Sequence, residues 1–180
     1  MMSHFGRRED FAIEVGSTIE HGDCQLDFYA YGIHLNRVDN AAYVGTALHC
    51  WPTALFSSDR WAAADTYSKM PFSSCSKMLL KKVMADNDLF HEHLAFNLGP
   101  VTDSFSTLTF GRPTDFVLLF IRNDRFGNDD SDLPKWNRAE HLETTPTHWL
   151  SLTIQRKEFE HICSGAYSCL EALCHSPSSK

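Results

Sequence analysis

The sequence predicts an α+β fold: a mostly antiparallel sheet, helices packed on one face of it, and an amphipathic helix at the C-terminus. Three observations predict this class. Apolar and polar residues alternate near the N-terminus, helical spacing dominates the next part of the chain, and a long apolar stripe ends it. The 180 residues fit one domain. We expect this single α+β domain over residues 1–175, followed by a polar tail over residues 176–180.

The N-terminal residues indicate a β-hairpin. Residues 10–19 alternate between apolar and polar side chains, and so do residues 25–31. This period of two is typical of strands that bury one face. Residues 20–23 predict the tight turn between them, because Gly22 can take the positive φ that such a turn needs. Residues 33–35 predict a short third strand.

The stretch from residue 39 to residue 85 is expected to be mainly helical. One helix is predicted over residues 41–48, with Pro52 as the point where it stops or restarts, because proline lacks a backbone N–H. Two more helices are predicted over residues 59–69 and 75–84. Each follows serines that can cap its first turn.

The second half of the chain predicts four strands and the final helix. Residues 89–98 and 147–154 alternate as half-buried strands do, and residues 105–110 give a weaker version of the same pattern. The continuous apolar run over residues 116–121 indicates a central strand that is covered on both faces. Residues 156–174 predict an amphipathic helix, with apolar residues three or four positions apart.

Composition and charge exclude several classes of protein. The chain has 16 Lys and Arg against 23 Asp and Glu, a net charge of −7, which argues against nucleic acid or an anionic membrane as a partner. Its longest apolar run is far shorter than the ~20 residues that span a bilayer. Charged residues at positions 7–10 argue against a secretory signal. We therefore expect a cytoplasmic protein whose six cysteines are reduced.

Two histidines are the most conspicuous candidate metal ligands. His91 and His93 are two positions apart in a predicted strand, so both imidazoles would point to one side and could share an ion. The sequence identifies no third ligand, and we favour a solvent-facing pair. Cys163, Cys169 and Cys174 lack the spacing of a zinc site, and the apolar stripe of the final helix explains them as packing residues.

Patterns typical of a catalytic nucleophile, a phosphate-binding loop or a dinucleotide site do not occur in the sequence. Cys24 follows the acidic Asp23, and Cys50 follows His49 at a spacing where helical side chains diverge, so neither suits a Cys/His nucleophile. We therefore predict no catalytic residue, no metal and no cofactor, which means that the protein is not an enzyme.

Residues 123–146 contain no periodic segment, and such a stretch within a domain is typical of a functional or mobile loop. Its aspartates lack the order of a calcium loop. They are Asp124, Asp129, Asp130 and Asp132. A solvated loop and a contact for a basic partner both fit this pattern. For a partner contact, Trp136 is the expected aromatic anchor.

Short motifs at the N-terminus resemble a group of bacterial immunity proteins. These motifs are Phe5-Gly6, Phe11-Ala-Ile-Glu14 and Tyr29-Ala-Tyr31-Gly32. Such proteins are small cytoplasmic antidotes encoded beside polymorphic or contact-dependent growth inhibition toxins, and the opening is similar to the immunity protein 42 type. The C-terminal strand and the amphipathic helix after it are similar to the way these proteins end. The resemblance covers roughly the first 35 and the last 30 residues.

The resemblance implies a binding protein that is not an enzyme. It would neutralise one cognate toxin domain by occluding its active site, as a monomer by itself or in a 1:1 complex. Many such toxins are nucleases with basic clefts, and a negatively charged inhibitor would be steered toward them. The expected partner is therefore a basic toxin domain.

Alternatives stay open for both the function and the surface. A small metal-dependent or Cys/His hydrolase would use His91 and His93 together with a carboxylate that the sequence does not identify. An acidic adaptor or chaperone for a secreted effector would have the same composition. The partner could also dock on a sheet face that carries Tyr29, Tyr31 and the two histidines, in place of the acidic loop.

Overall fold

The structure, a computed structural model, describes residues 2–37, 40–56, 71–86, 88, 91, 93–96, 98, 102–111, 115–123, 130–139 and 147–176. Within these residues the strands form two five-stranded sheets, and every strand pairing is antiparallel. The predicted α+β class, mostly antiparallel with a C-terminal helix, is confirmed. The helix predicted over residues 59–69 lies outside the described residues.

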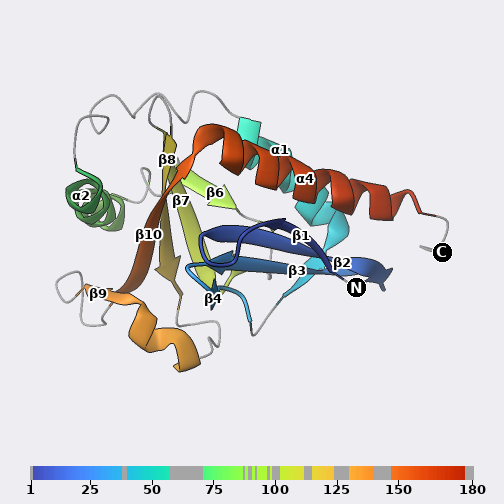
Figure 1. Cartoon of the computed structure of the whole chain (residues 1–180), viewed down its shortest axis with the longest axis horizontal. Coiled ribbons are helices and arrows are strands. Elements are labelled where there is room, and N and C mark those ends of the chain that lie inside the picture. Colours follow the sequence, from blue (N-terminus) through green and yellow to red (C-terminus); the bar gives the residue numbers. More distant parts are fainter. Residues whose placement is uncertain are drawn as a thin grey trace.

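The first sheet is formed by the N-terminal strands (Figure 1). Its order is β1 (Met2–Gly6), β2 (Phe11–Glu20), β3 (Asp23–Ala30) and β4 (Ile33–His34), and β5 (Ala41–Tyr43) pairs with the opposite end of β3. The tight turn between β2 and β3 has Gly22 at a φ of 91°, so the predicted hairpin and its glycine are confirmed. The register of β2 against β3 shifts between Val15 and Ile19, which is a bulge that bends β2.

The second sheet contains the strands of the second half of the chain. Its order is β6 (Leu94–Phe96), β7 (Phe105–Gly111), β8 (Asp115–Arg122), β10 (Thr147–Gln155) and β9 (Asn137–Ala139). Every residue of β8 is buried, which confirms the predicted central strand. Between β8 and β10, the segment expected to be irregular contains a 3-10 helix, η4 (Asp130–Lys135), and the short strand β9.

Three α-helices have their bounds within the described residues: α1 (Val44–Phe56), α2 (Phe72–Ala85) and α4 (Arg156–Cys174). The last matches the predicted residues 156–174. Helix α4 packs against β1, β2 and α1 and also contacts β8 and β10. Gly165 allows this close approach, because a Cβ there would lie 2.6 Å from the ring of Phe5.

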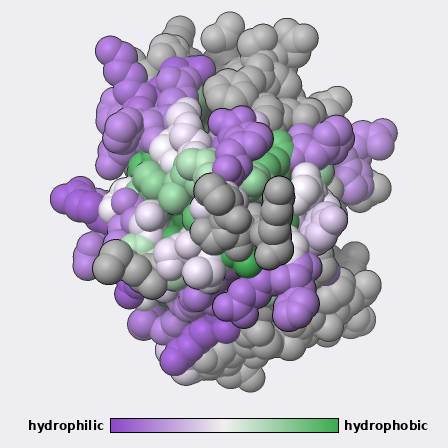
Figure 2. Space-filling model, turned by 90° about the vertical axis from the view of Figure 1, so that its right-hand side faces the viewer, coloured by the Kyte–Doolittle hydropathy of each residue, from purple (hydrophilic) through white to green (hydrophobic). Residues whose placement is uncertain are grey.

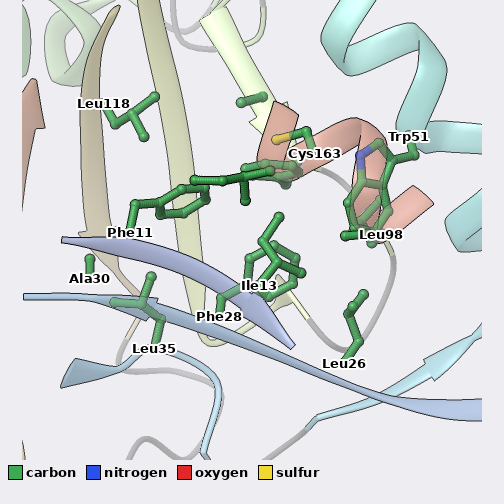
Figure 3. Packing of buried hydrophobic residues seen from close by; sticks show 14 of the residues in the cluster. Phe11, Ile13, Leu26, Phe28, Ala30, Leu35, Trp51, Leu98, Leu118 and Cys163 are labelled. Atoms are coloured by element: carbon green, nitrogen blue, oxygen red, sulfur yellow. The ribbon is translucent and has the colours of Figure 1, made fainter. Parts of the chain in front are cut away.

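The main core lies between the two sheets and α4. The ring centroid of Phe159 on α4 is 5.8 Å from that of Phe11 on β2 and 5.4 Å from that of Phe116 on β8. Figure 3 shows side chains of this cluster converging from separate elements, among them Phe11, Leu118 and Cys163. One helix thus joins both sheets through a common apolar layer.

The arrangement of the helices differs from the expected single sheet covered on one face. Alternate residues of β8 face opposite sides, with Leu118 in the main core and Leu119 in a second apolar cluster beneath α2. Since both faces of the second sheet are apolar, α2 covers the face that points away from α4 (Figure 1).

Helix α1 continues through Pro52, where a stop or restart was predicted. Burial of Ala47 and Trp51 in the main core offsets the lost hydrogen bond.

No helix among the described residues is both long and apolar enough to cross a bilayer.

Candidate partner-binding surface

The outward face of the first sheet carries a network of polar side chains. Side chains alternate along β2 and β3, so that one face packs into the main core while Glu14, Asp27 and Tyr29 lie on the other. All three are buried. Side chains from β1, β4 and the connecting segments cover them. We call this set the outer-face network: His4, Arg8, Glu14, Gln25, Asp27, Tyr29, His34 and Asn40.

Glu14 is 2% exposed, and its charge is neutralised by side chains from the preceding strand and turn. The guanidinium of Arg8 donates from Nε to Oε1 and from Nη2 to Oε2, the latter over 2.6 Å. Nδ1 of His4 lies 2.9 Å from Oε1. Burial alone would raise the pKa of Glu14, but the hydrogen bonds from Arg8 and His4 outweigh it and hold the pKa below its ordinary value.

Asp27 is the register partner of Glu14 on β3 and is 3% exposed. Its Oδ1 accepts hydrogen bonds from Nε2 of His34 over 2.9 Å and from Nδ2 of Asn40 over 2.6 Å. Its Oδ2 accepts one from Nε2 of Gln25 over 2.8 Å. Burial would raise the pKa of Asp27, and these hydrogen bonds lower it below the ordinary value. Two opposed carboxylates, which would repel each other across a hairpin, are thus both compensated.

Planar groups stack over the carboxylates. The guanidinium carbon of Arg8 lies 4.3 Å from the ring centroid of Tyr29, and the ring of Tyr29 stacks on that of His34 at 4.6 Å. Burial and the nearby carboxylates raise the pKa of Tyr29, so its phenol stays protonated at neutral pH. The network therefore connects all four strands from β1 to β4 into one ordered polar surface.

Both buried carboxyl groups of the network stay ionised at neutral pH. A general acid or base at neutral pH needs a pKa near 7, whereas both carboxyl groups have lowered pKa values and are held in ion pairs. Among the described residues, no group of three or more His, Cys, Asp or Glu side chains is placed to hold a metal ion. The network holds the exposed side chains of His4 and Arg8 against the sheet face through their contacts with the buried Glu14.

An open hollow of about 520 Å³ lies beside the network, where β2 bulges. Its lining includes Glu20, His21 and Asp23 at the hairpin turn and Gly16 at the bulge. Asn40 lines it as well, and because Asn40 also binds Asp27, the hollow borders the outer-face network. We call it the hairpin hollow.

The predicted acidic loop is described in part. Asp124 and Asp129 lie outside the described residues, and Asp130 begins η4. Asp132 is paired with Nζ of Lys135 at 2.5 Å, with 19% of its side chain exposed. Trp136 is partly buried and packs against the main core.

This loop lies next to the first sheet. Nη1 of Arg37, from the segment after β4, donates to Oγ of Ser131 in η4 over 3.2 Å. The charge of the same Arg37 also has a small lowering effect on the pKa of Tyr29, which belongs to the alternative sheet-face surface. Ser131 of the acidic loop therefore lies beside the segment that follows β4 of the first sheet. The sheet face predicted to carry Tyr29, Tyr31, His91 and His93 together does not form, because the two histidines precede β6 of the second sheet.

The prediction that His91 and His93 form a pair on one strand is wrong. His91 and His93 have helical backbone, and the strand begins only at Leu94. His91 is exposed, whereas His93 is buried, stacks on Phe110 at 4.3 Å and lies with Nδ1 3.0 Å from the carbonyl oxygen of Thr109. Residues two apart on a helix diverge by about 200°, so the alternation does not bring the two imidazoles together.

The cysteines are distributed over the cores. All six lie among the described residues and form no disulfide. Cys163 is fully buried within the main core, as predicted for the apolar stripe, and burial raises the pKa of its thiol. Burial also raises the pKa of Cys24 to about 11, which opposes formation of a thiolate nucleophile.

Comparisons with known proteins give one structural likeness. No family model matches the sequence, and no curated protein matches it. A crystal structure of CdiI from Burkholderia dolosa AUO158 matches over 97% of this chain and 100% of that chain, with a TM-score of 0.50 and 11% identity. The chain folds like CdiI. At this identity the likeness concerns the fold, and it extends over both chains from end to end.

Proposed function

We propose that this protein is an immunity protein that binds and neutralises one cognate toxin domain. The observation that carries the proposal is the fold shared along the whole chain with CdiI, an immunity protein of contact-dependent growth inhibition. The N-terminal motifs that resemble immunity proteins support it independently, since they are a feature of the sequence and the likeness to CdiI is a feature of the fold.

The toxin is proposed to be basic, and a nuclease is the class that fits best. A net charge of −7 steers an inhibitor toward a cleft built to hold phosphates. We propose that the protein occludes that cleft as a monomer in a 1:1 complex in the cytoplasm. Like-charged substrates would then compete with the inhibitor for the same basic residues.

The acidic loop is proposed as one contact with the toxin. Its residues are Asp124, Asp129, Asp130, Asp132 and Trp136. Changing Asp129, Asp130 and Asp132 to Asn should slow association and flatten its salt dependence, as rim charges do. Trp136→Ala should raise the dissociation rate and also lower stability, because the indole packs on the main core. Unchanged kinetics in both variants would remove the loop from the interface.

The test of the proposed function is co-expression with the product of the adjacent gene. A tagged copy of this chain should retain that product through size-exclusion chromatography, and light scattering should give the mass of a 1:1 complex. The double variant His91→Ala and His93→Gln should bind equally well, apart from a loss of stability at the buried His93. Loss of protection in a folded double variant that still binds would favour the hydrolase alternative.

A further inference from the structure

The β2–β3 hairpin contains a second pair of opposed carboxylates, which lies at its turn. Glu20 and Asp23 are register partners at the turn, as Glu14 and Asp27 are further along the strands. The inner pair is held by the guanidinium of Arg8 on Glu14 and by hydrogen bonds from His34, Gln25 and Asn40 to Asp27. In the described part of the chain, no side chain forms an ion pair with Glu20 or Asp23. Like charges opposed across a hairpin destabilise it, so a cation is expected to gain free energy here.

Both of these carboxylates line the hairpin hollow. Among the described residues that line it, none is a lysine or an arginine. The lining includes Gly16, where a Cβ would lie 3.1 Å from the Cβ of Gln25, so a larger residue there would crowd another residue of the lining. A hollow of about 520 Å³ has room for a long side chain with its hydration water. Its shape and charge both suit a protruding cationic group.

Tyr43 adds a rigid aromatic group beside the hollow. It is the register partner of Asp23, and at 56% it is the more exposed of the two large apolar side chains that stand out among the described residues. Its ring lies over two glycines, with ring atoms 3.0 Å and 3.1 Å from where a Cβ of Gly22 and of Gly45 would be. A ring held in this way loses little freedom on binding, and tyrosine is enriched among interface hot spots.

Figure 2 views the molecule from the end where this hairpin turns. Apolar residues gather in the middle of that face, and hydrophilic residues surround them. The apolar side chains that pack at the edge of the main core include Ile19 on β2 and Leu173 and Cys174 at the end of α4. These partly buried side chains lie at the same end of the molecule as the hairpin turn (Figure 1).

Resting on the proposed function, we propose that this hairpin end docks the toxin and that the hairpin hollow receives a lysine or arginine side chain from it. The cation would neutralise the opposed pair of Glu20 and Asp23 and lie against the face of Tyr43, where a cation–π contact adds to the attraction. A partner of this chemistry is a basic protein surface with a projecting side chain.

One toxin domain can reach both this surface and the acidic loop. Strand β3, eight residues and roughly 24 Å long at ~3.4 Å a residue, runs from the hairpin turn to β4, and Arg37 after β4 contacts Ser131 of the loop. An ordinary interface covers about 800 Å² on each partner, which is about 30 Å across. The hairpin end therefore adds a second contact and does not compete with the first.

The experiment measures association and dissociation rates with the purified toxin domain at two salt concentrations. The test variants are Glu20→Gln with Asp23→Asn, and Tyr43→Ala. The control is Glu158→Gln with Glu160→Gln, which removes the same charge from exposed positions at the start of α4, at the other end of this helix from Leu173 and Cys174. We expect the first variant to slow association about fivefold to tenfold at low salt and the control by less than twofold. Tyr43→Ala should raise the dissociation rate about tenfold or more.

Folding is checked in the same samples. Removing a like-charge pair should leave the melting temperature of the Glu20→Gln and Asp23→Asn variant unchanged or raise it, so slower binding cannot come from unfolding. Wild-type binding with variants that match the control would overturn this inference and leave the proposed function standing. A wild-type protein that fails to bind the toxin would overturn both.

Discussion

Removing Arg8 should destabilise the protein more than removing the carboxylate that Arg8 neutralises. The side chain of Glu14 is 2% exposed, whereas that of Arg8 is 50% exposed. In Arg8→Ala the carboxylate stays buried, and of its two side-chain partners only His4 remains. In Glu14→Gln the guanidinium can turn into water, and a neutral amide remains to accept a hydrogen bond. Leaving Glu14 without its partner should therefore cost more folding free energy than leaving Arg8 without its partner.

The magnitude follows from this asymmetry. Breaking a fully buried ion pair from one side costs about 3–5 kcal/mol, and the solvent around Arg8 together with the remaining His4 reduces this to about 2–3 kcal/mol for Arg8→Ala. We expect about 1 kcal/mol for Glu14→Gln. The double variant should have nearly the same free energy of unfolding as Glu14→Gln alone, because it no longer contains the buried, unpaired carboxylate. The coupling energy is then about 2 kcal/mol.

Urea unfolding of the four proteins at pH 7 measures these differences, and a second series at lower pH tests the cause. A lowered folded-state pKa makes the contribution of Glu14 complete above its unfolded pKa, near 4.3, and this contribution is lost as the pH falls through the folded value. In Arg8→Ala the effect of burial dominates, so the pKa of Glu14 rises and protonation relieves the variant. The gap to wild type should therefore narrow from pH 7 to pH 4. Equal, additive losses at every pH would refute the reasoning.

Other parts of the fold give shorter tests. Phe159→Ala should lower the free energy of unfolding by about 3–5 kcal/mol through a cavity in the main core, and an unchanged melting temperature would mean that this face of α4 is misplaced. Gly165→Ala should cost about 1–2 kcal/mol, because the new Cβ meets the ring of Phe5; a gain in stability would contradict the close approach. Thiol titration of unfolded, non-reduced protein should return all six cysteines, with Cys24 and Cys163 protected in the folded state; labelling only after reductant would indicate disulfides.

The sequence predicts well those elements whose periodicity is produced by one buried face. The final helix shows its stripe because Phe159, Ile162 and Leu170 all point into the main core. The hairpin alternates because Phe11 and Phe28 face that core from neighbouring strands. In both places, burial repeats with the period of the backbone.

Prediction fails where a pattern has two sources or where contacts are distant. His91 and His93 have helical backbone, and the short strand β6 begins directly after them. Reading the whole stretch with one period of two residues therefore mistakes the helical part for strand. The division into two sheets depends on which strands pair across long separations. The outer-face network was missed for a related reason. Glu14 and Asp27 alternate as exposed residues do, and only the folded chain brings Arg8 and His34 over them.

Growth protection is the most direct measurement of an immunity function. Cells that express the toxin domain encoded next to this chain should stop growing, and co-expression of this chain should restore growth. The variant with Glu20→Gln and Asp23→Asn should protect less than the control with Glu158→Gln and Glu160→Gln. The measurement should be made at matched protein levels, so that stability does not enter. Cells that remain arrested although folded protein is present at or above the level of the toxin would contradict the proposed function.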